Sequence, residues 1–176
     1  MGRHLLNGLA ILCLAAAMLF SVQAGDATNA PPNPSTNGKS TTNSTDLWKL
    51  MEDYFEAVAR NQLPKASELG QAVIIKGTND WNVLRFFSWR IFADRGIKHR
   101  DRALALTAAQ RAAELTGEKE PAVLDAYARA LFENGRAEEA IRHQKRAVEL
   151  CQTEGPRIEM EANLNRYLRL TKQGRR

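Results

Sequence analysis

The chain has few of the residues from which catalytic and metal sites are built. Its 176 residues include two cysteines, Cys13 and Cys151, and three histidines. Two cysteines so far apart exclude a disulfide-dense scaffold, a cysteine-based zinc site and a CxxC redox pair. His99 and His143 fall in different repeats, each without a partner four residues away, so neither predicts a metal site on one helix face. Because the patterns GxxxxGK[ST], GxGxxG and GxSxG are also missing, we expect no enzyme activity, no metal and no cofactor.

Long hydrophobic runs are equally scarce. The longest, Leu9 to Phe20, has 12 residues, whereas a spanning helix needs about 20. It follows Arg3 and precedes the small-residue stretch Val22-Gln23-Ala24. These features of residues 1–24 favour a signal peptide cleaved after Ala24 over an uncleaved anchor. We therefore expect an exported protein, periplasmic or secreted, with no transmembrane segment after cleavage.

Residues 25–46 contain no Leu, Ile, Val or aromatic residue. Of these 22 residues, 17 are Thr, Ser, Asn, Pro or Gly. Such a segment cannot bury enough apolar area to offset the entropy lost on ordering. It predicts a disordered linker in front of one folded domain at 47–176.

The net charge of +5 comes from 25 Lys and Arg against 20 Asp and Glu. The last 11 residues hold five bases and no acid, whereas the rest of the chain is nearly balanced. A broad nucleic-acid-binding surface is therefore not expected, and we predict no nucleic-acid partner. A second cationic cluster at 95–102 is diluted by acids and is typical of a solvated turn. The C-terminal bases suit a helix end or could contact an anionic surface; they are Arg166, Arg169, Lys172, Arg175 and Arg176.

The region 47–176 shows helical periodicity and an internal repeat. The segment Asp101–Leu115 aligns with Arg136–Leu150 at an offset of 35 residues, and the helices before them also match. We predict helical hairpins at 47–76, 81–116 and 121–152 and a capping helix at 156–172. The boundary signals are Asp80 as a cap, Gly117 and Gly135 as turns, Pro121 in a first turn, and Gly155-Pro156 between the last two helices.

The best repeat resembles the tetratricopeptide repeat. Its matching residues are Leu124, Tyr127-Ala128, Leu131, Gly135, Ala140 and Ala147. This repeat departs from the family at Gln144, where an aromatic residue is usual, and at Gln152, where the closing proline would lie. The middle hairpin departs from it by four extra residues, 97–100. The same repeat is similar to the helical tail that follows a thioredoxin-like domain in some exported bacterial proteins, although that domain is missing here. The resemblance implies an all-α, right-handed stack of helix-turn-helix repeats.

Such a stack implies a concave face, lined by the first helix of each repeat, that binds a peptide or a partner helix. We therefore predict non-catalytic protein–protein interaction. Two alternatives are a module that binds anionic lipid or cell-wall polymer through its basic C-terminal end, and an accessory subunit of a thiol–disulfide enzyme, which would need an exposed Cys151. The alternative interpretation is that Trp89 packs between repeats and that Arg129 pairs with Asp125 or Glu133 as an ordinary surface ion pair. The residues predicted on the concave face are Glu52, Glu56, Arg85, Trp89, Asp125, Arg129 and Glu133.

Overall fold

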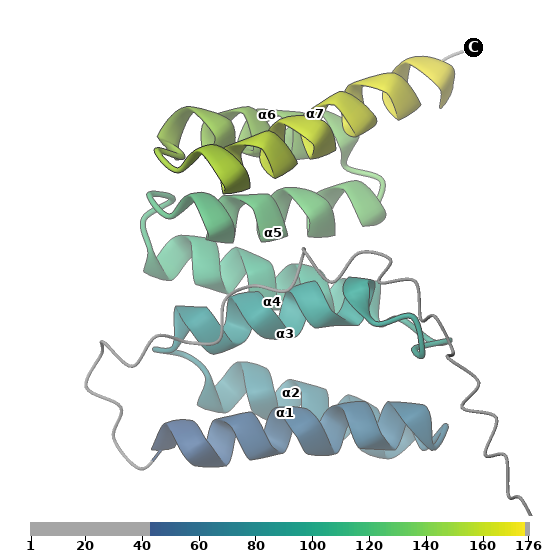
Figure 1. Ribbon diagram of the computed structural model, residues 1–176. Helices are drawn as coiled ribbons and strands as arrows, with labels where there is room; N and C mark the ends of the chain where they lie inside the picture. Colours follow the sequence, from purple (N-terminus) through teal and green to yellow (C-terminus); the bar gives the residue numbers. More distant parts are fainter. Residues whose placement is uncertain (1–42, 175–176) are drawn as a thin grey trace, which may run out of the picture. The chain divides into compact units, whose positions relative to one another are not determined.

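The computed structural model describes residues 43–174, and this part of the chain is a stack of α-helices in two layers (Figure 1). Helices α1, α3, α5 and α7 form one layer, and α2, α4 and α6 form the other. Helices α1–α2, α3–α4 and α5–α6 pack as hairpins, and α7 packs on α6. The all-α stack that the sequence predicts is confirmed. The helices are α1 (Asn43–Ala59), α2 (Leu63–Lys76), α3 (Trp81–Ala93), α4 (Arg102–Leu115), α5 (Pro121–Glu133), α6 (Ala137–Leu150) and α7 (Glu154–Gly174).

Most helix ends lie where the sequence signals predict them. The Asp80 carboxylate accepts a hydrogen bond from the backbone N–H of Val83 at 3.0 Å and so caps α3. Pro121 occupies the first turn of α5, where its missing N–H costs nothing. Gly117 and Gly135 have φ of +58° and +79°, in the left-handed region that glycine tolerates best. These two glycines therefore allow the tight turns after α4 and α5.

The first residues of two helices differ from prediction. Helix α1 begins at Asn43, inside the predicted linker 25–46, and the negative charge of Asp46 in its first turn favours this earlier start. Helix α7 begins at Glu154, two residues before the predicted start at Pro156, so Gly155 lies inside its first turn together with Pro156. A proline in a first turn loses no intrahelical hydrogen bond, which is why the helix tolerates it. The predicted signal peptide at 1–24 and linker residues 25–42 lie outside the described residues.

Small residues allow the helices to approach closely. Four alanines of α4, at positions 105, 108, 109 and 112, are completely buried. Gly70 in α2 is equally constrained, because a Cβ there would lie 2.4 Å from Leu104 Cδ2 and 3.1 Å from Tyr54 Cε2. Large side chains then fill the space between hairpins, as where Tyr54 of α1 meets Phe87 of α3 edge to face at 4.8 Å. One buried cluster consequently runs from Leu47 in α1 to Tyr167 in α7.

The long connection between α3 and α4 is held to the stack by its own side chains. Ile97 is buried, with 6% of its surface exposed. The Arg100 guanidinium donates to the backbone oxygens of Ile91 at 3.1 Å and Asp94 at 3.0 Å. Asp101 then caps α4 by accepting from the Leu104 N–H at 2.9 Å. The four extra residues of the middle hairpin are therefore part of a fixed loop.

Candidate binding surface

The predicted concave-face residues all lie on α1, α3 and α5, which are neighbours in one layer. On α1, both glutamates already have partners within the chain. Glu52 pairs with Arg90 of α3, and Glu56 pairs with Arg60 at 2.6 Å one turn along its own helix. The Arg90 guanidinium also lies 4.1 Å from the centre of the Phe55 ring. The α1 end of the layer is thus electrostatically satisfied, and the open chemistry lies on α3 and α5.

Arg85 is the most unusual charged residue of α3. Only 9% of its surface is exposed, and its Nη2 donates a hydrogen bond to Asn82 Oδ1 at 3.0 Å. Its Nε is buried and has no hydrogen-bond partner within residues 43–174. Burial lowers the pKa of Arg85, and the Asp125 carboxylate only partly opposes this effect. Arg85 is therefore a buried cation whose charge is incompletely compensated.

Asp125 is held by amide groups rather than by an arginine. Its Oδ1 accepts from Gln144 Nε2 of α6 at 2.7 Å and from Asn163 Nδ2 of α7 at 3.1 Å. Gln144 is fully buried and also donates to the backbone oxygen of Met160 at 3.0 Å. The residue that departs from the family's aromatic position is thus the polar bridge that joins α5, α6 and α7. Sequence reasoning missed this role, because the partners of Gln144 lie 16 and 19 residues away.

Arg129 crosses from α5 to α3. Its Nη2 donates to the backbone oxygen of Phe92 at 3.2 Å, and its guanidinium lies 5.8 Å from the centre of the Phe92 ring. Among the described residues it forms no ion pair with Asp125 or Glu133, so the predicted alternative of an ordinary surface pair is wrong. Burial lowers the pKa of Arg129, and its Nε is buried without a partner in the described chain. Arg129 thus repeats the pattern of Arg85 one helix further along.

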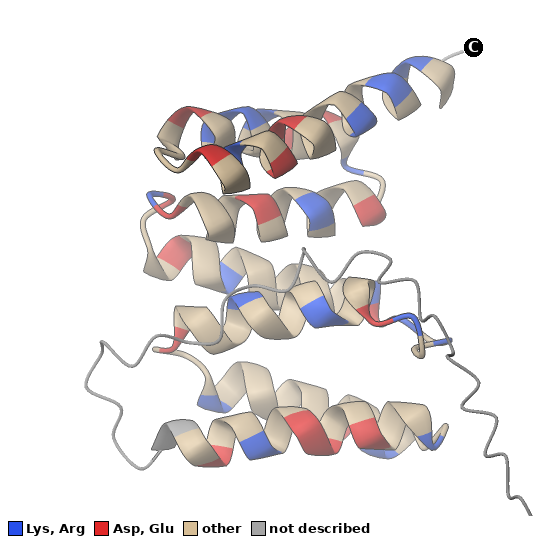
Figure 2. Ribbon diagram, viewed as in Figure 1, with Lys and Arg blue, Asp and Glu red and all other residues tan. Residues whose placement is uncertain are grey.

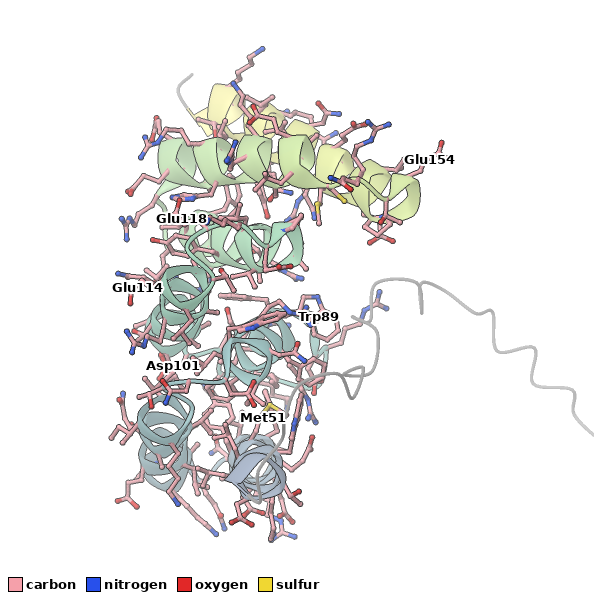
Figure 3. All side chains as sticks on the ribbon, turned by 90° about the vertical axis from the view of Figure 1, so that its left-hand side faces the viewer. Met51, Trp89, Asp101, Glu114, Glu118 and Glu154 are labelled. Atoms are coloured by element: carbon pink, nitrogen blue, oxygen red, sulfur yellow. The ribbon has the colours of Figure 1, made fainter. Side chains whose placement is uncertain are left out.

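An aromatic stripe lies beside these arginines. Trp89 of α3 is half-buried, and its ring lies 5.7 Å from that of Phe86 on the same helix. Phe86 in turn meets Trp48 of α1 edge to face at 5.3 Å. Figure 3 shows Trp89 on the opposite side of the molecule from Glu114 of α4. Trp89 therefore both packs on a neighbour and keeps an accessible part. The three-residue spacing of Phe86 and Trp89 was a signal for this stripe, whereas the contact with Trp48 was not visible in the sequence.

Of the five basic residues predicted for an anionic surface, the three that the structure describes differ in exposure. Arg169 and Lys172 are exposed on α7, whereas Arg166 is half-buried with its guanidinium 5.1 Å from the centre of the Tyr167 ring. Figure 2 shows acidic residues towards the start of α7 and basic residues towards its end. Arg175 and Arg176 lie outside the described residues. No described helix is both long enough and apolar enough to cross a membrane.

The remaining reactive side chains are dispersed. The described part of the chain contains no group of three or more His, Cys, Asp and Glu residues that could hold a metal ion. His99 is exposed in the α3–α4 loop, as expected for a solvated residue. The sequence pattern also predicts a solvated helix residue at His143, and this prediction is wrong, because the half-buried ring of His143 packs 4.7 Å from that of Tyr127. Cys151 is half-buried, and its thiol donates to the Thr153 backbone oxygen at 3.4 Å.

Comparisons of the chain with protein-family models, with curated proteins and with solved structures find no match. The resemblance to the tetratricopeptide repeat remains a prediction from the sequence. The case for a function therefore depends on the chemistry of the layer formed by α1, α3, α5 and α7.

Proposed function

We propose that this chain is an exported, non-catalytic repeat protein that binds an acidic segment of a partner protein, extended or helical, across α3 and α5. The observation that supports this most directly is a pair of arginines, the buried Arg85 and the half-buried Arg129, whose buried Nε atoms have no partner in the described chain. Removing a charged guanidinium from water without a counter-ion costs several kcal/mol. A ligand carboxylate placed next to these two guanidinium groups would offset part of that cost by charge attraction.

The aromatic stripe defines the second half of the proposed ligand. Trp48, Phe86 and Trp89 are each half-buried, so they present apolar area without being part of the sealed core. Tryptophan and arginine are the residue types that most often dominate binding energy at protein interfaces. We infer a ligand segment in which acidic residues lie next to an aromatic or aliphatic residue.

The proposal is tested by selecting peptides from a random display library against the purified full chain. We expect the selected peptides to be enriched in Asp and Glu next to an apolar residue. Arg129→Glu should weaken their binding at least tenfold. Lys145→Glu, the same charge change at an exposed residue of α6, should leave their binding unchanged. Thermal unfolding of both variants separates lost binding from lost folding. Selected peptides without acidic enrichment, or equal binding to folded Arg129→Glu, would refute the proposal.

Export is a separate part of the proposal, supported by the composition of residues 1–24. It is tested by expressing the full chain with a C-terminal tag and determining the amino terminus of the protein recovered outside the cytoplasm. We expect the recovered chain to begin at Gly25. A chain found only in the cytoplasm with residues 1–24 retained would contradict export.

The basic end of α7 supports a second candidate, a module that associates with anionic surfaces. Its observation is the separation of charge along α7, with Arg169 and Lys172 exposed near the end. Sedimentation with anionic vesicles in low salt tests it, using a variant that lacks residues 173–176 and carries Arg166→Gln and Arg169→Gln. Failure of the wild-type chain to sediment would eliminate this candidate. The thiol–disulfide alternative has weaker support, because Cys151 is half-buried.

A further inference from the structure

A recess in the surface lies away from the arginine and aromatic residues of α3 and α5. It has a volume of about 510 Å³ and lies between the α1–α2 hairpin and the α3–α4 loop. Its apolar floor includes Tyr54, Val58 and Ala66, and its lip includes Lys98, His99 and Arg102. Figure 3 shows Asp101, which also lines it, on the opposite side of the molecule from Trp89. The volume falls within the range of small-molecule sites in proteins.

The cations around the recess are not neutralised by ion pairs within residues 43–174. Arg100 is committed to the loop through its bonds to the backbone of Ile91 and Asp94. Neither Lys98 nor Arg102 forms an ion pair with any carboxylate in residues 43–174, and both are exposed. The nearby Asp101 is occupied at Oδ1 by capping α4. The lip therefore carries a net positive charge next to an apolar floor.

Tyr54 provides an independent indication that the recess binds a ligand. Its side chain is 98% buried, since only 2% of the residue is exposed, yet it lines the recess. Its ring is fixed edge to face against Phe55 at 5.0 Å and Phe87 at 4.8 Å. Burial raises the pKa of the Tyr54 hydroxyl, and the Asp101 charge at the recess raises it further. It therefore remains a protonated donor at neutral pH.

We propose that this recess binds a small anion that carries a short apolar group, such as an alkyl carboxylate or alkyl phosphate. Lys98 and Arg102 receive the anionic head, the Tyr54 hydroxyl donates to one of its oxygens, and Val58 and Ala66 contact the apolar part. Charge-assisted hydrogen bonds orient the head, and apolar burial supplies the remaining affinity. This site shares no residue with the proposed peptide surface, so either proposal can fail without the other.

The test uses octanoate and octyl phosphate as probes, and follows backbone amide signals of the full chain by NMR. For ligands of this size we expect a dissociation constant on the order of 1 mM. Shifts should centre on residues 54–67 and 98–102. Inorganic phosphate and the cation octylammonium should each bind at least tenfold more weakly. Equal binding of inorganic phosphate would show a simple anion contact and overturn the proposal. Binding to phosphatidylglycerol vesicles without binding to octanoate would overturn it in favour of a membrane contact.

Variants locate the effect. Lys98→Glu with Arg102→Glu should abolish binding, whereas Lys119→Glu with Lys145→Glu, the same charge change on exposed residues outside the recess, should not. Ser67→Trp should block the recess from its exposed rim without disturbing the core. Tyr54→Phe should weaken binding about three- to tenfold if the hydroxyl donates as proposed. Unchanged binding in folded Lys98→Glu/Arg102→Glu or in Ser67→Trp would refute the assignment.

Discussion

Replacing Arg85 by methionine should make the protein more stable and at the same time remove its peptide binding. Arg85 is 91% buried, and its folded-state pKa is lowered, mainly by desolvation. For a base, a lowered pKa means that folding disfavours the charged form, and this penalty persists at every pH at which arginine stays protonated. Methionine is unbranched and adaptable, so it fills much of the same space without a charge.

The magnitude follows from two opposing terms. Replacing buried ionic groups by apolar residues of similar volume is often stabilising, by about 1–4 kcal/mol. Arg85→Met also removes the 3.0 Å bond to Asn82, worth about 1 kcal/mol, but Asn82 is half-exposed and water can replace that bond. We expect a net gain of about 1 kcal/mol. For a domain of this size that raises the melting temperature by about 4 °C.

Thermal and urea unfolding measure the first effect, and titration with the selected acidic peptides measures the second. Arg142→Met is the matched control, since its side chain is 68% exposed on α6. We expect this control to change stability by less than about 0.5 kcal/mol and to leave peptide binding intact. A loss of more than about 1 kcal/mol in Arg85→Met would show that the charge is compensated in the folded chain, and the reasoning would fail.

Three further predictions concern packing, the polar bridge and pH. Gly70→Ala should lower the free energy of unfolding by about 1–2 kcal/mol in urea melts, because overpacking outweighs the gain in helix propensity. The control Gly155→Ala has open space around the new methyl group and should not be destabilising. Gln144→Leu should lower the free energy of unfolding by about 2–3 kcal/mol, because it removes buried hydrogen bonds from Asp125 and from the α7 backbone. An unchanged free energy of unfolding would contradict the role of Gln144 as a polar bridge. Burial raises the pKa of Tyr167 to about 12, so the unfolded chain loses this proton first as pH rises above 10. Tyr167 should therefore contribute about 2 kcal/mol to the fall in stability between pH 10 and 12, and Tyr167→Phe should make this fall smaller by that amount.

The local signals in the sequence predicted much of the fold. Asp80, Gly117, Pro121 and Gly135 act within a few residues of their own position, so a cap or a turn can be recognised without knowing the rest of the structure. Helix α7 was placed two residues late, because the pair Gly155-Pro156 was interpreted as a break although a proline is equally suited to a first helical turn.

The candidate surface was predicted less completely, because its properties depend on contacts between helices. The positions of Arg85 and Trp89 on the helix were enough to place them on one face. Their burial was not predictable, since it depends on what α1 and α5 bring against α3. The role of Gln144 was missed for the same reason, because a lone glutamine gives no sign of the carboxylate and the carbonyl that it joins.

Helix α7 has an electrostatic consequence for the surface next to it. Through Asn163 it holds Asp125, the carboxylate whose charge acts on Arg85. A chain without residues 154–174 would release one of the two amides on this carboxylate and allow it to turn towards the arginine. The last helix thus does more than cover the end of the hydrophobic core. By restraining an internal counter-ion, it leaves the charge of Arg85 incompletely compensated, which is the condition that the proposed binding of an acidic segment requires.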